Sequence, residues 1–262
     1  MNPKRTTGPS VILTIAGYDP SSGAGITADV KTISAHKCYG VSCITALTVQ
    51  STTGVKRVDP VEGRIITETL EELASDFDIA AIKIGMLGSA EGARAVLAFL
   101  MRNKVAHVVL DPVIRSSSGA QLLPKDGIQI LKEKMLGLTS VITPNIAEAA
   151  ELTGLRVNRA EEMAAAAKAL HHLGARNVIV TGGHLDPPAD LVSSREKEPA
   201  MLVGSRVVST STHGTGCAFS TSLACHLASG KGLIDAARAA KGFVESAIRN
   251  APGVGKGNGP LL

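Results

Sequence analysis

Apolar runs of strand length alternate with segments of helical spacing along most of this chain, and this alternation constrains the fold more than any other feature. One helical segment repeats apolar residues from Met163 to Leu173 and ends at Gly174, a residue type typical of a helix C-terminus. Continuous apolar strands separated by helices indicate a mostly parallel sheet covered on both faces. We therefore predict an α/β fold with strands at residues 11–16, 41–49, 80–84, 105–110, 140–142 and 177–180.

No internal repeat and no linker divides the 262 residues, a length sufficient for one large α/β core. We expect a disordered or extended segment over residues 1–10 and one domain over residues 11–262. The polar stretch at 184–199, which contains Pro187 and Pro188, predicts a loop or a hairpin.

The composition argues against several classes of protein. No apolar run approaches the ~20 residues that a membrane helix needs, and the polar start "MNPKRTTGPS" is not typical of a signal peptide. Aromatic residues make up 2% and Trp is absent, which disfavours stacking on single-stranded nucleic acid. The four cysteines show no C-x-x-C spacing, which indicates free thiols in a reducing compartment. We expect a cytoplasmic protein that binds small molecules and neither nucleic acid nor membrane.

Glycines, small hydroxyls, amides or acids follow every expected strand. In open α/β sheets, ligands bind beyond the carboxyl ends of the strands, so these segments predict a ligand cleft along one sheet edge. The alternative is that any strand–helix connection needs turn residues. In chain order the segments are "GYDPSSGAG", "TVQSTTG" with Gln50, "GMLG", "DPVIRSSSG", "TPNIAEA" and "TGGH".

The stretch "THGTGCAFS" at 212–220 places Gly214, Thr215 and Gly216 before an expected helix. Such a turn leaves backbone N–H groups unpaired at the positive end of the helix dipole, a combination that binds phosphate or a developing anion. Glycine permits the close backbone approach that this requires. No G-x-x-x-x-G-K-[ST] motif is present, so this is not a Walker A loop. From local sequence alone, an anion hole and a plain helix entry remain equal alternatives.

Cys217 falls in the first turn of that helix, where the dipole lowers the pKa of a thiol. A partly ionised thiolate could accept a proton. A covalent nucleophile would need a neighbouring base, and His213 is the nearest in sequence. The remaining alternative is a small buried residue.

Asp111 and Glu148 are the acids best placed at strand ends to hold Mg²⁺, directly or through water. Each also has a structural alternative. Asp111 precedes Pro112 and can cap a helix, and Glu148 can complete a capping box with an N-cap at Asn145.

Seven segments that occur in order give the chain a specific resemblance. Together, from about residue 11 to residue 259, they closely resemble the hydroxymethylpyrimidine/phosphomethylpyrimidine kinases of thiamine biosynthesis, which belong to the ribokinase-like superfamily. The segments are "AGYDPSSGAGITADVKT", "ITALTVQSTTGV", "KIGML", "VVLDPV", "ITPNIAEAAELTG", "TGGH" and "THGTGC".

This resemblance implies a three-layer α/β/α fold with a central, mostly parallel sheet, the use of ATP and Mg²⁺, and a homodimer. It also implies two successive phosphorylations. The first is of the hydroxymethyl group of 4-amino-5-hydroxymethyl-2-methylpyrimidine, and the second converts the monophosphate to the diphosphate.

The same resemblance implies roles for individual residues. Gln50 matches the glutamine that reads the aminopyrimidine edge, since an amide offers both a donor and an acceptor. Cys217 stands where many ribokinase-like sugar kinases have an aspartate base. Asp19, Ala24, Met86 and Val113 match positions that line the pyrimidine pocket; Gly214, Thr215, Gly216 and Cys217 match the anion hole; Asp111, Asn145, Glu148, Thr181 and Thr215 match the nucleotide region, with Asp111 and Glu148 near the metal.

One departure bears on activity. Many members of that family have lysine where this chain has Thr181, so a positive charge expected at the ATP phosphates is missing, and Arg115 and Lys83 are the candidates to replace it. Three other functions compete: a pyridoxal/pyridoxine kinase, a Cys/His hydrolase, and a non-catalytic pyrimidine-binding module, which the absence of that lysine favours.

Overall fold

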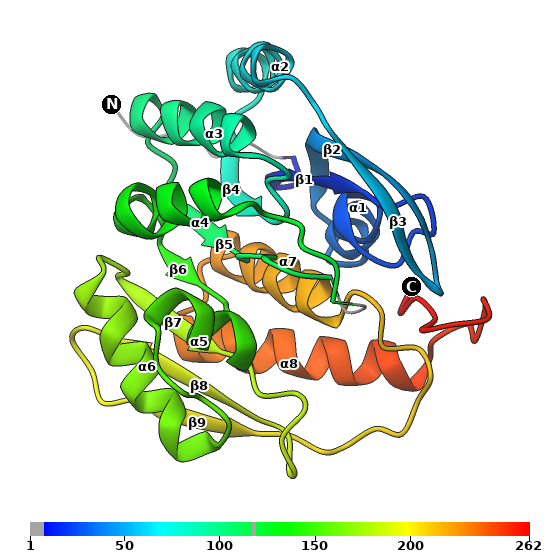
Figure 1. The fold of residues 1–262 in the computed structure, drawn as a ribbon, viewed down its shortest axis with the longest axis vertical. Coiled ribbons are helices and arrows are strands. Elements are labelled where there is room, and N and C mark those ends of the chain that lie inside the picture. Colours follow the sequence, from blue (N-terminus) through cyan, green and yellow to red (C-terminus); the bar gives the residue numbers. More distant parts are fainter. Residues whose placement is uncertain (1–7, 117–118) are drawn as a thin grey trace.

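A computed structural model of the chain describes residues 8–116 and 119–262, so most of the expected N-terminal segment, residues 1–10, lies outside the described residues. Within the described residues, nine strands form one sheet in the order β3-β2-β1-β4-β5-β6-β7-β8-β9 (Figure 1). The strands are β1 (Val11–Tyr18), β2 (Tyr39–Ser51), β3 (Gly54–Pro60), β4 (Ile79–Ile84), β5 (His107–Leu110), β6 (Val141–Ile142), β7 (Asn177–Val180), β8 (Ala189–Ser194) and β9 (Ala200–Val203).

The six strands from β2 to β7 in the sheet order run parallel to one another, as the alternating pattern predicts. All six expected strands are confirmed, some with shifted ends. The pattern missed β3, an edge strand antiparallel to β2 that carries charged residues. The expected loop or hairpin at 184–199 contains β8, which pairs antiparallel with β7 and β9.

Helices cover both faces of the sheet, so the predicted three-layer α/β/α fold is confirmed (Figure 1). One layer packs α2 to α6 on the sheet, and the other packs α1, α7 and α8 on the opposite face. The helices are α1 (Gly25–Ala35), α2 (Gly63–Asp76), α3 (Ala90–Arg102), α4 (Lys125–Ile130), the π-helical turn η1 (Leu131–Met135), the 3₁₀ turn η2 (Leu136–Leu138), α5 (Ile146–Thr153), α6 (Ala160–His172), α7 (Thr215–Ala228) and α8 (Leu233–Arg249).

Successive residues of each strand point to opposite faces of the sheet, and they fill the two hydrophobic cores, one under each helical layer. Leu13 and Ile15 of β1 belong to the cluster beneath α2–α6, whereas Ile12 belongs to the cluster beneath α1, α7 and α8. Because both faces are buried, the strands read as continuous apolar runs. The expected helix end at Gly174 is confirmed, since α6 stops at His172 and Gly174 has φ +115°.

No helix in the described part of the chain is long and apolar enough to span a bilayer.

Candidate active site

The carboxyl ends of the six parallel strands lie along one edge of the sheet, and the predicted site residues follow them. This edge therefore collects residues that are far apart in sequence. Asp19 follows β1, Gln50 lies near the end of β2, Met86 follows β4, Asp111 and Val113 follow β5, Asn145 follows β6, and Thr181 follows β7.

Asp19 organises the loop between β1 and α1. Its carboxylate is 3% exposed and accepts hydrogen bonds from the Ser21 amide (2.8 Å), the Ser21 hydroxyl (2.7 Å) and the Ala24 amide (2.9 Å). Burial acts to raise the pKa of Asp19, but hydrogen bonds from His213 and Ser21 hold this pKa below its usual value. Asp19 is therefore an ionised anchor that fixes Ala24 at the start of α1.

His213 joins the Asp19 loop to Gln50, a contact that the sequence did not predict. Nε2 of His213 lies 2.8 Å from Oδ2 of Asp19 and 3.1 Å from Nε2 of Gln50. Oε1 of Gln50 accepts from the Thr48 hydroxyl at 3.2 Å. Because His213 immediately precedes Gly214, this triad also ties the predicted pyrimidine reader to the start of α7. The sequence feature that could have pointed to this contact is the histidine within the motif "THGTGC".

Met86 and Val113 belong to one small apolar cluster at the same strand-end edge. Met86 is buried with Ala46 and Leu122, and Val113 packs against the same cluster. Val113 has φ +39°, a left-handed conformation that is strained for a β-branched residue. Strain of this kind concentrates at functional sites, because the surrounding fold must maintain it. This cluster suits a small heterocycle with an apolar substituent.

The start of α7 has the backbone geometry expected for an anion hole. Gly214 is the N-cap with φ +81°, and Thr215, Gly216 and Cys217 form the first turn. Among the residues that the structure describes, no side chain caps this end, so its N–H groups are available to a ligand. A Cβ on Gly214 would lie 1.8 Å from the Gly23 carbonyl oxygen. Glycine is therefore required here for both conformation and close packing.

The expected low pKa of Cys217 is wrong. Burial raises the pKa of the Cys217 thiol to about 12, although Lys83 acts to lower it. The residue keeps partial exposure and its sulfur faces the backbone N–H of Gly25. Loss of solvation outweighs the helix dipole at this position. The neutral thiol also argues against a Cys/His hydrolase, which needs an ionised cysteine as its nucleophile.

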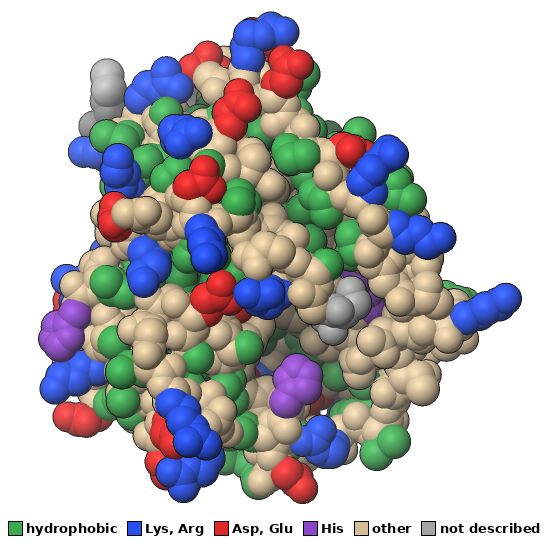
Figure 2. Space-filling view, viewed as in Figure 1, with side chains coloured by type: hydrophobic (Ala, Val, Ile, Leu, Met, Phe, Trp, Pro, Cys, Tyr) green, Lys and Arg blue, Asp and Glu red, His purple; other side chains and the backbone are tan. Residues whose placement is uncertain are grey.

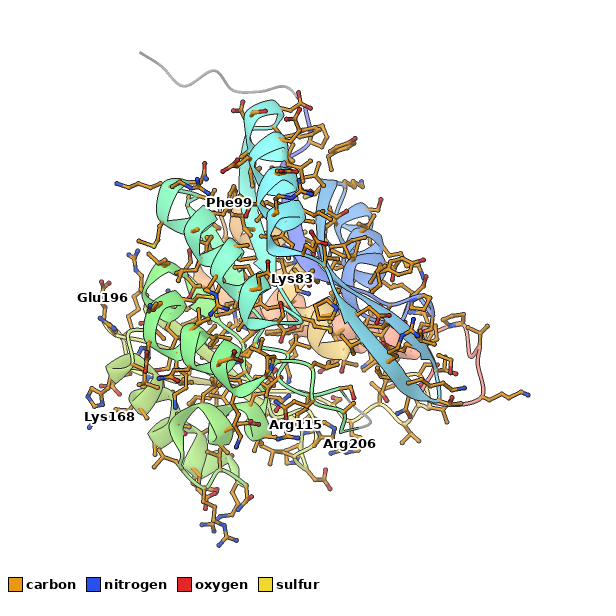
Figure 3. The ribbon with its side chains drawn as sticks, turned by 45° about the horizontal axis from the view of Figure 1, so that its top comes forward. Lys83, Phe99, Arg115, Lys168, Glu196 and Arg206 are labelled. Carbon is orange, nitrogen blue, oxygen red and sulfur yellow. The ribbon has the colours of Figure 1, made fainter. Side chains whose placement is uncertain are left out.

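Lys83 does not replace the missing lysine charge at Thr181. It is labelled in Figure 3. Its side chain is fully buried and its Nζ lies 2.8 Å from Oδ2 of Asp29, which is also fully buried. Burial acts to lower the pKa of Lys83, but the charge of Asp29 outweighs this effect and raises it. Arg115 is exposed and lies 3.4 Å from Glu151, so of the two candidates only Arg115 can reach a ligand in solvent.

Asp111 and Glu148 are two buried acids whose environments disfavour ionisation. Asp111 accepts from the Ser220 hydroxyl at 3.0 Å, and burial raises its pKa. Burial and the charge of Asp111 raise the pKa of Glu148 to about 8. A divalent cation would relieve both effects, and two carboxylates completed by water and phosphate oxygens fit the preference of Mg²⁺.

The structural alternative for Glu148 is also confirmed. Asn145 caps α5 by accepting from the Glu148 amide at 2.9 Å, and Oε2 of Glu148 accepts from the Asn145 amide at 3.0 Å. Oε1 accepts from the Ile114 amide at 3.2 Å. Each oxygen keeps a second lone pair for water or a cation. Thr181 is held beside this turn, since its amide donates to the Pro144 carbonyl at 2.9 Å.

We predict that Glu148→Gln weakens the dependence of stability on pH. Between the ordinary pKa of about 4.5 and the raised pKa of about 8, the folded protein holds a proton on Glu148 that the unfolded chain has lost. The free energy of unfolding therefore falls as pH rises through this window. Each pKa unit corresponds to about 1.4 kcal/mol. Across this pH window, the free energy of unfolding of the wild type should therefore fall by on the order of a few kcal/mol relative to that of Glu148→Gln.

Urea unfolding of the metal-free protein at several pH values between about 4.5 and 8 measures this difference. Glu151→Gln is the matched control, because Glu151 lies on the same helix and is ion-paired with Arg115 near the surface. Parallel stability–pH curves for wild type and Glu148→Gln would contradict the prediction.

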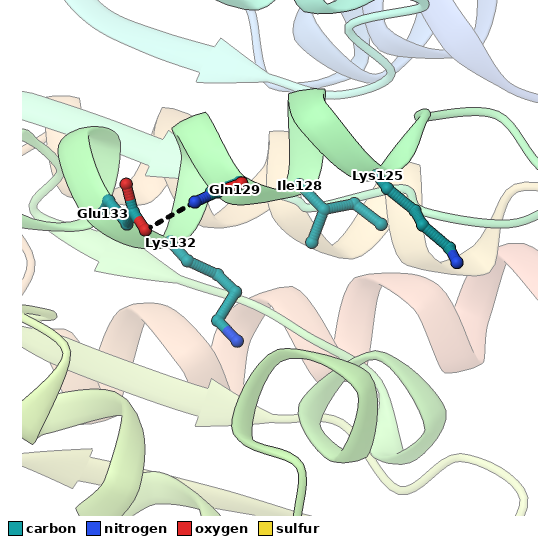
Figure 4. Close-up of a pocket in the computed structure, with 5 residues that line it drawn as sticks. All are labelled: Lys125, Ile128, Gln129, Lys132 and Glu133. Carbon is teal, nitrogen blue, oxygen red and sulfur yellow. Dashed lines mark hydrogen bonds between the residues drawn. The ribbon is translucent and has the colours of Figure 1, made fainter.

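A separate hollow of about 290 Å³ lies on α4 and η1, lined by Lys125, Ile128, Gln129, Lys132 and Glu133 (Figure 4). It contains none of the predicted site residues. Gln129 donates to Glu133 across it at 2.9 Å. On the face shown in Figure 2, basic and acidic side chains are interspersed, as the scattered charges of the sequence suggest. The strand-end edge is therefore the stronger candidate site.

Comparison with known proteins agrees with this geometry. Residues 19–262 match the family described as phosphomethylpyrimidine kinase. A hydroxymethylpyrimidine/phosphomethylpyrimidine kinase of Haemophilus influenzae is 42% identical over 254 residues, which cover 95% of this chain and 94% of that protein. The thiamine biosynthesis bifunctional protein ThiED of Geobacter sulfurreducens is 41% identical over 252 residues and 95% of this chain, which spans only 51% of that protein.

A solved structure is similar throughout. The ADP complex of Bacillus subtilis pyridoxal kinase superimposes with a TM-score of 0.88 at 30% identity, covering 97% of this chain and 96% of that chain. The family match covers most of the sequence, including every predicted site residue. The resemblance carried by the strand-end motifs is thereby confirmed, and the chain belongs to the phosphomethylpyrimidine kinase family.

Proposed function

We propose that this chain is an ATP-dependent kinase that phosphorylates 4-amino-5-hydroxymethyl-2-methylpyrimidine and then its monophosphate, giving the diphosphate. The observation that carries the proposal is the triad of Asp19, His213 and Gln50, which ends one residue before the anion-hole glycine. His213, which contacts the predicted reader Gln50, is thus covalently adjacent to the predicted phosphate site. The name of the Haemophilus influenzae relative supports this substrate class.

Phosphoryl transfer depends mostly on positioning and charge stabilisation. Gln50 holds the aminopyrimidine edge, and Met86 and Val113 contact its apolar face. The amides of residues 214–217 stabilise the phosphoryl group in transfer. Asn145, Thr181 and Thr215 contact the nucleotide. Asp111 and Glu148 would hold Mg²⁺, directly or through water, and the cation would supply positive charge to the phosphate oxygens.

We also propose that residues 11–262 form one domain, because the strands between Val11 and Val203 share one sheet and the later helices α7 and α8 pack on it. The family resemblance further supports a cytoplasmic homodimer.

We propose a modest role for the Cys217 thiolate, the minor form of this residue, as acceptor of the substrate hydroxyl proton. Cys217→Ala should lower kcat about 10- to 100-fold and leave the anion hole intact, because the amide at 217 remains. The effect falls below that of an efficient base, since the raised pKa of Cys217 leaves only a small fraction of the thiolate that can accept the proton. Steady-state kinetics measure this change. Full kcat in the variant would rule out the base role.

Gln50→Ala should raise KM for the pyrimidine alcohol about 10- to 100-fold, because the loss of an amide leaves buried donors and acceptors of the ligand unpaired. KM for ATP should stay within about twofold, since Gln50 belongs to the pyrimidine side of the site. Titration of each substrate at saturating levels of the other measures both constants. An equal rise in both would contradict the assignment of Gln50.

One experiment separates the competing functions. The protein is incubated with Mg-ATP and, in turn, hydroxymethylpyrimidine, its monophosphate and pyridoxal, while ADP and product mass are followed. ADP with both pyrimidine phosphates supports the proposal. Turnover of pyridoxal alone would favour the function named for the Bacillus subtilis neighbour. Binding without ADP would favour a non-catalytic module, the alternative motivated by Thr181.

A further inference from the structure

The last segment of the chain contacts two parts of the proposed pyrimidine site, the hairpin that carries Gln50 and the segment that carries His213. We call residues 253–262 the strap. The strap lies beside the tip of the β2–β3 hairpin, which carries Gln50, and close to the start of α7 (Figure 1). Its sequence, "GVGKGNGPLL", is rich in glycine.

The strap first meets the hairpin at Thr52, two residues beyond Gln50. The Gly257 amide donates to Oγ1 of Thr52 at 3.2 Å. A Cβ on Gly257 would lie 2.1 Å from the Thr52 carbonyl oxygen, and one on Gly255 would lie 2.5 Å from Cγ2 of Thr52. Contacts this short leave no room for a side chain. The glycines are therefore required by the close approach of the strap to the hairpin.

The strap next holds the segment that carries His213. The Gly259 amide donates to the Thr210 carbonyl at 3.0 Å, and the His213 amide donates to the Gly259 carbonyl at 3.1 Å. Pro260 pairs with His213 in a parallel bridge. The backbone that aims the His213 ring at Asp19 and Gln50 is thus bonded directly to the strap.

Beyond this point the strap is anchored. Leu261 is 4% exposed and packs with Ala218 of α7 and Ala247 of α8. Nζ of Lys31 donates to the carbonyl oxygen of Leu262 at 2.7 Å and lies 3.4 Å from that of Ser22 in the Asp19 loop. The apolar anchor and this lysine fix one end of the strap, so its glycines hold the hairpin and the His213 segment in a constant relation.

We propose that the strap is a positioning element of the pyrimidine site, which sets Gln50 and His213 relative to each other. The inference rests on the proposed function for its substrate. The strap does not contact the reacting atoms. It restrains the hairpin through Thr52 and the His213 backbone through Gly259, so that the polar groups are preorganised for the heterocycle.

Gly257→Ala tests this inference, because its methyl group must displace Thr52. We expect KM for hydroxymethylpyrimidine to rise about tenfold while KM for ATP changes less than about twofold, since small displacements of positioning groups cost binding and rate. Hydrogen exchange should become faster in the β2–β3 hairpin and unchanged in β4 and β5. The exchange measurement does not depend on turnover.

Gly242→Ala in α8 is the matched control, because a Cβ there meets no heavy atom within 4 Å. Thr52→Val removes the hydroxyl acceptor without a steric clash, so it should shift KM and exchange in the same direction even if Gly257→Ala fails to fold. An inactive wild type would overturn the proposed function. The hydrogen-exchange data would still test whether the strap restrains the hairpin. Unchanged hydrogen exchange in the hairpin, or equal rises in the two KM values, would overturn the proposal that the strap positions the pyrimidine site.

Discussion

Replacing Gly214 by alanine should lower kcat about 10²- to 10³-fold, the size of effect seen when anion-stabilising donors are lost. The residue has φ +81°, and its ideal Cβ would lie 1.8 Å from the Gly23 carbonyl oxygen. The clash is with backbone, so either the start of α7 or the Asp19 loop must move. The N–H groups of the first turn then no longer converge on the transferring phosphoryl group.

Steady-state ADP release measures kcat of Gly214→Ala, and circular dichroism checks that the variant is folded. Gly137→Ala is a suitable control, because Gly137 is exposed and a Cβ there meets nothing within 4 Å. A folded Gly214→Ala protein with kcat close to that of Gly137→Ala would show that the start of α7 is not the phosphate site.

Lys83→Met should destabilise the fold by about 3–5 kcal/mol, the usual cost of removing one partner from a buried ion pair. Asp29 would keep its charge at zero exposure, with only the hydroxyls of Thr14 (2.6 Å) and Thr221 (2.8 Å) as partners. The double variant Lys83→Met/Asp29→Asn should recover most of the loss, because no unpaired charge remains buried and the hydroxyls can still bond the amide.

Urea unfolding compares these proteins with Arg64→Met, which breaks an exposed ion pair with Glu68 and should change stability very little. A loss for Lys83→Met as small as that for Arg64→Met would contradict the prediction. A double variant as unstable as the single one would show that packing, not charge, accounts for the loss.

Several features were predictable because they depend on nearby residues only. The apolar runs gave the six parallel strands, since a strand buried on both faces must be apolar along its length. The capping box of Asn145 and Glu148 spans three residues and appears as expected. The common strand-end edge follows from parallel topology. By contrast β3 was missed, because an edge strand with charged, exposed residues lacks an apolar run.

The sequence by itself thus determined the six parallel strands, the helical layers, the family, and the positions at strand ends that face one edge. Only the tertiary structure decided how those positions behave. His213 meets Asp19 across 194 residues, and Gly257 meets Thr52 across 205. Burial raises the pKa of the Cys217 thiol although the helix dipole acts to lower it. The fold also brings Lys83 and Asp29 together as a buried ion pair. The solvation of a side chain and its long-range partners depend on which distant segments pack against it, and a local sequence pattern does not contain that information.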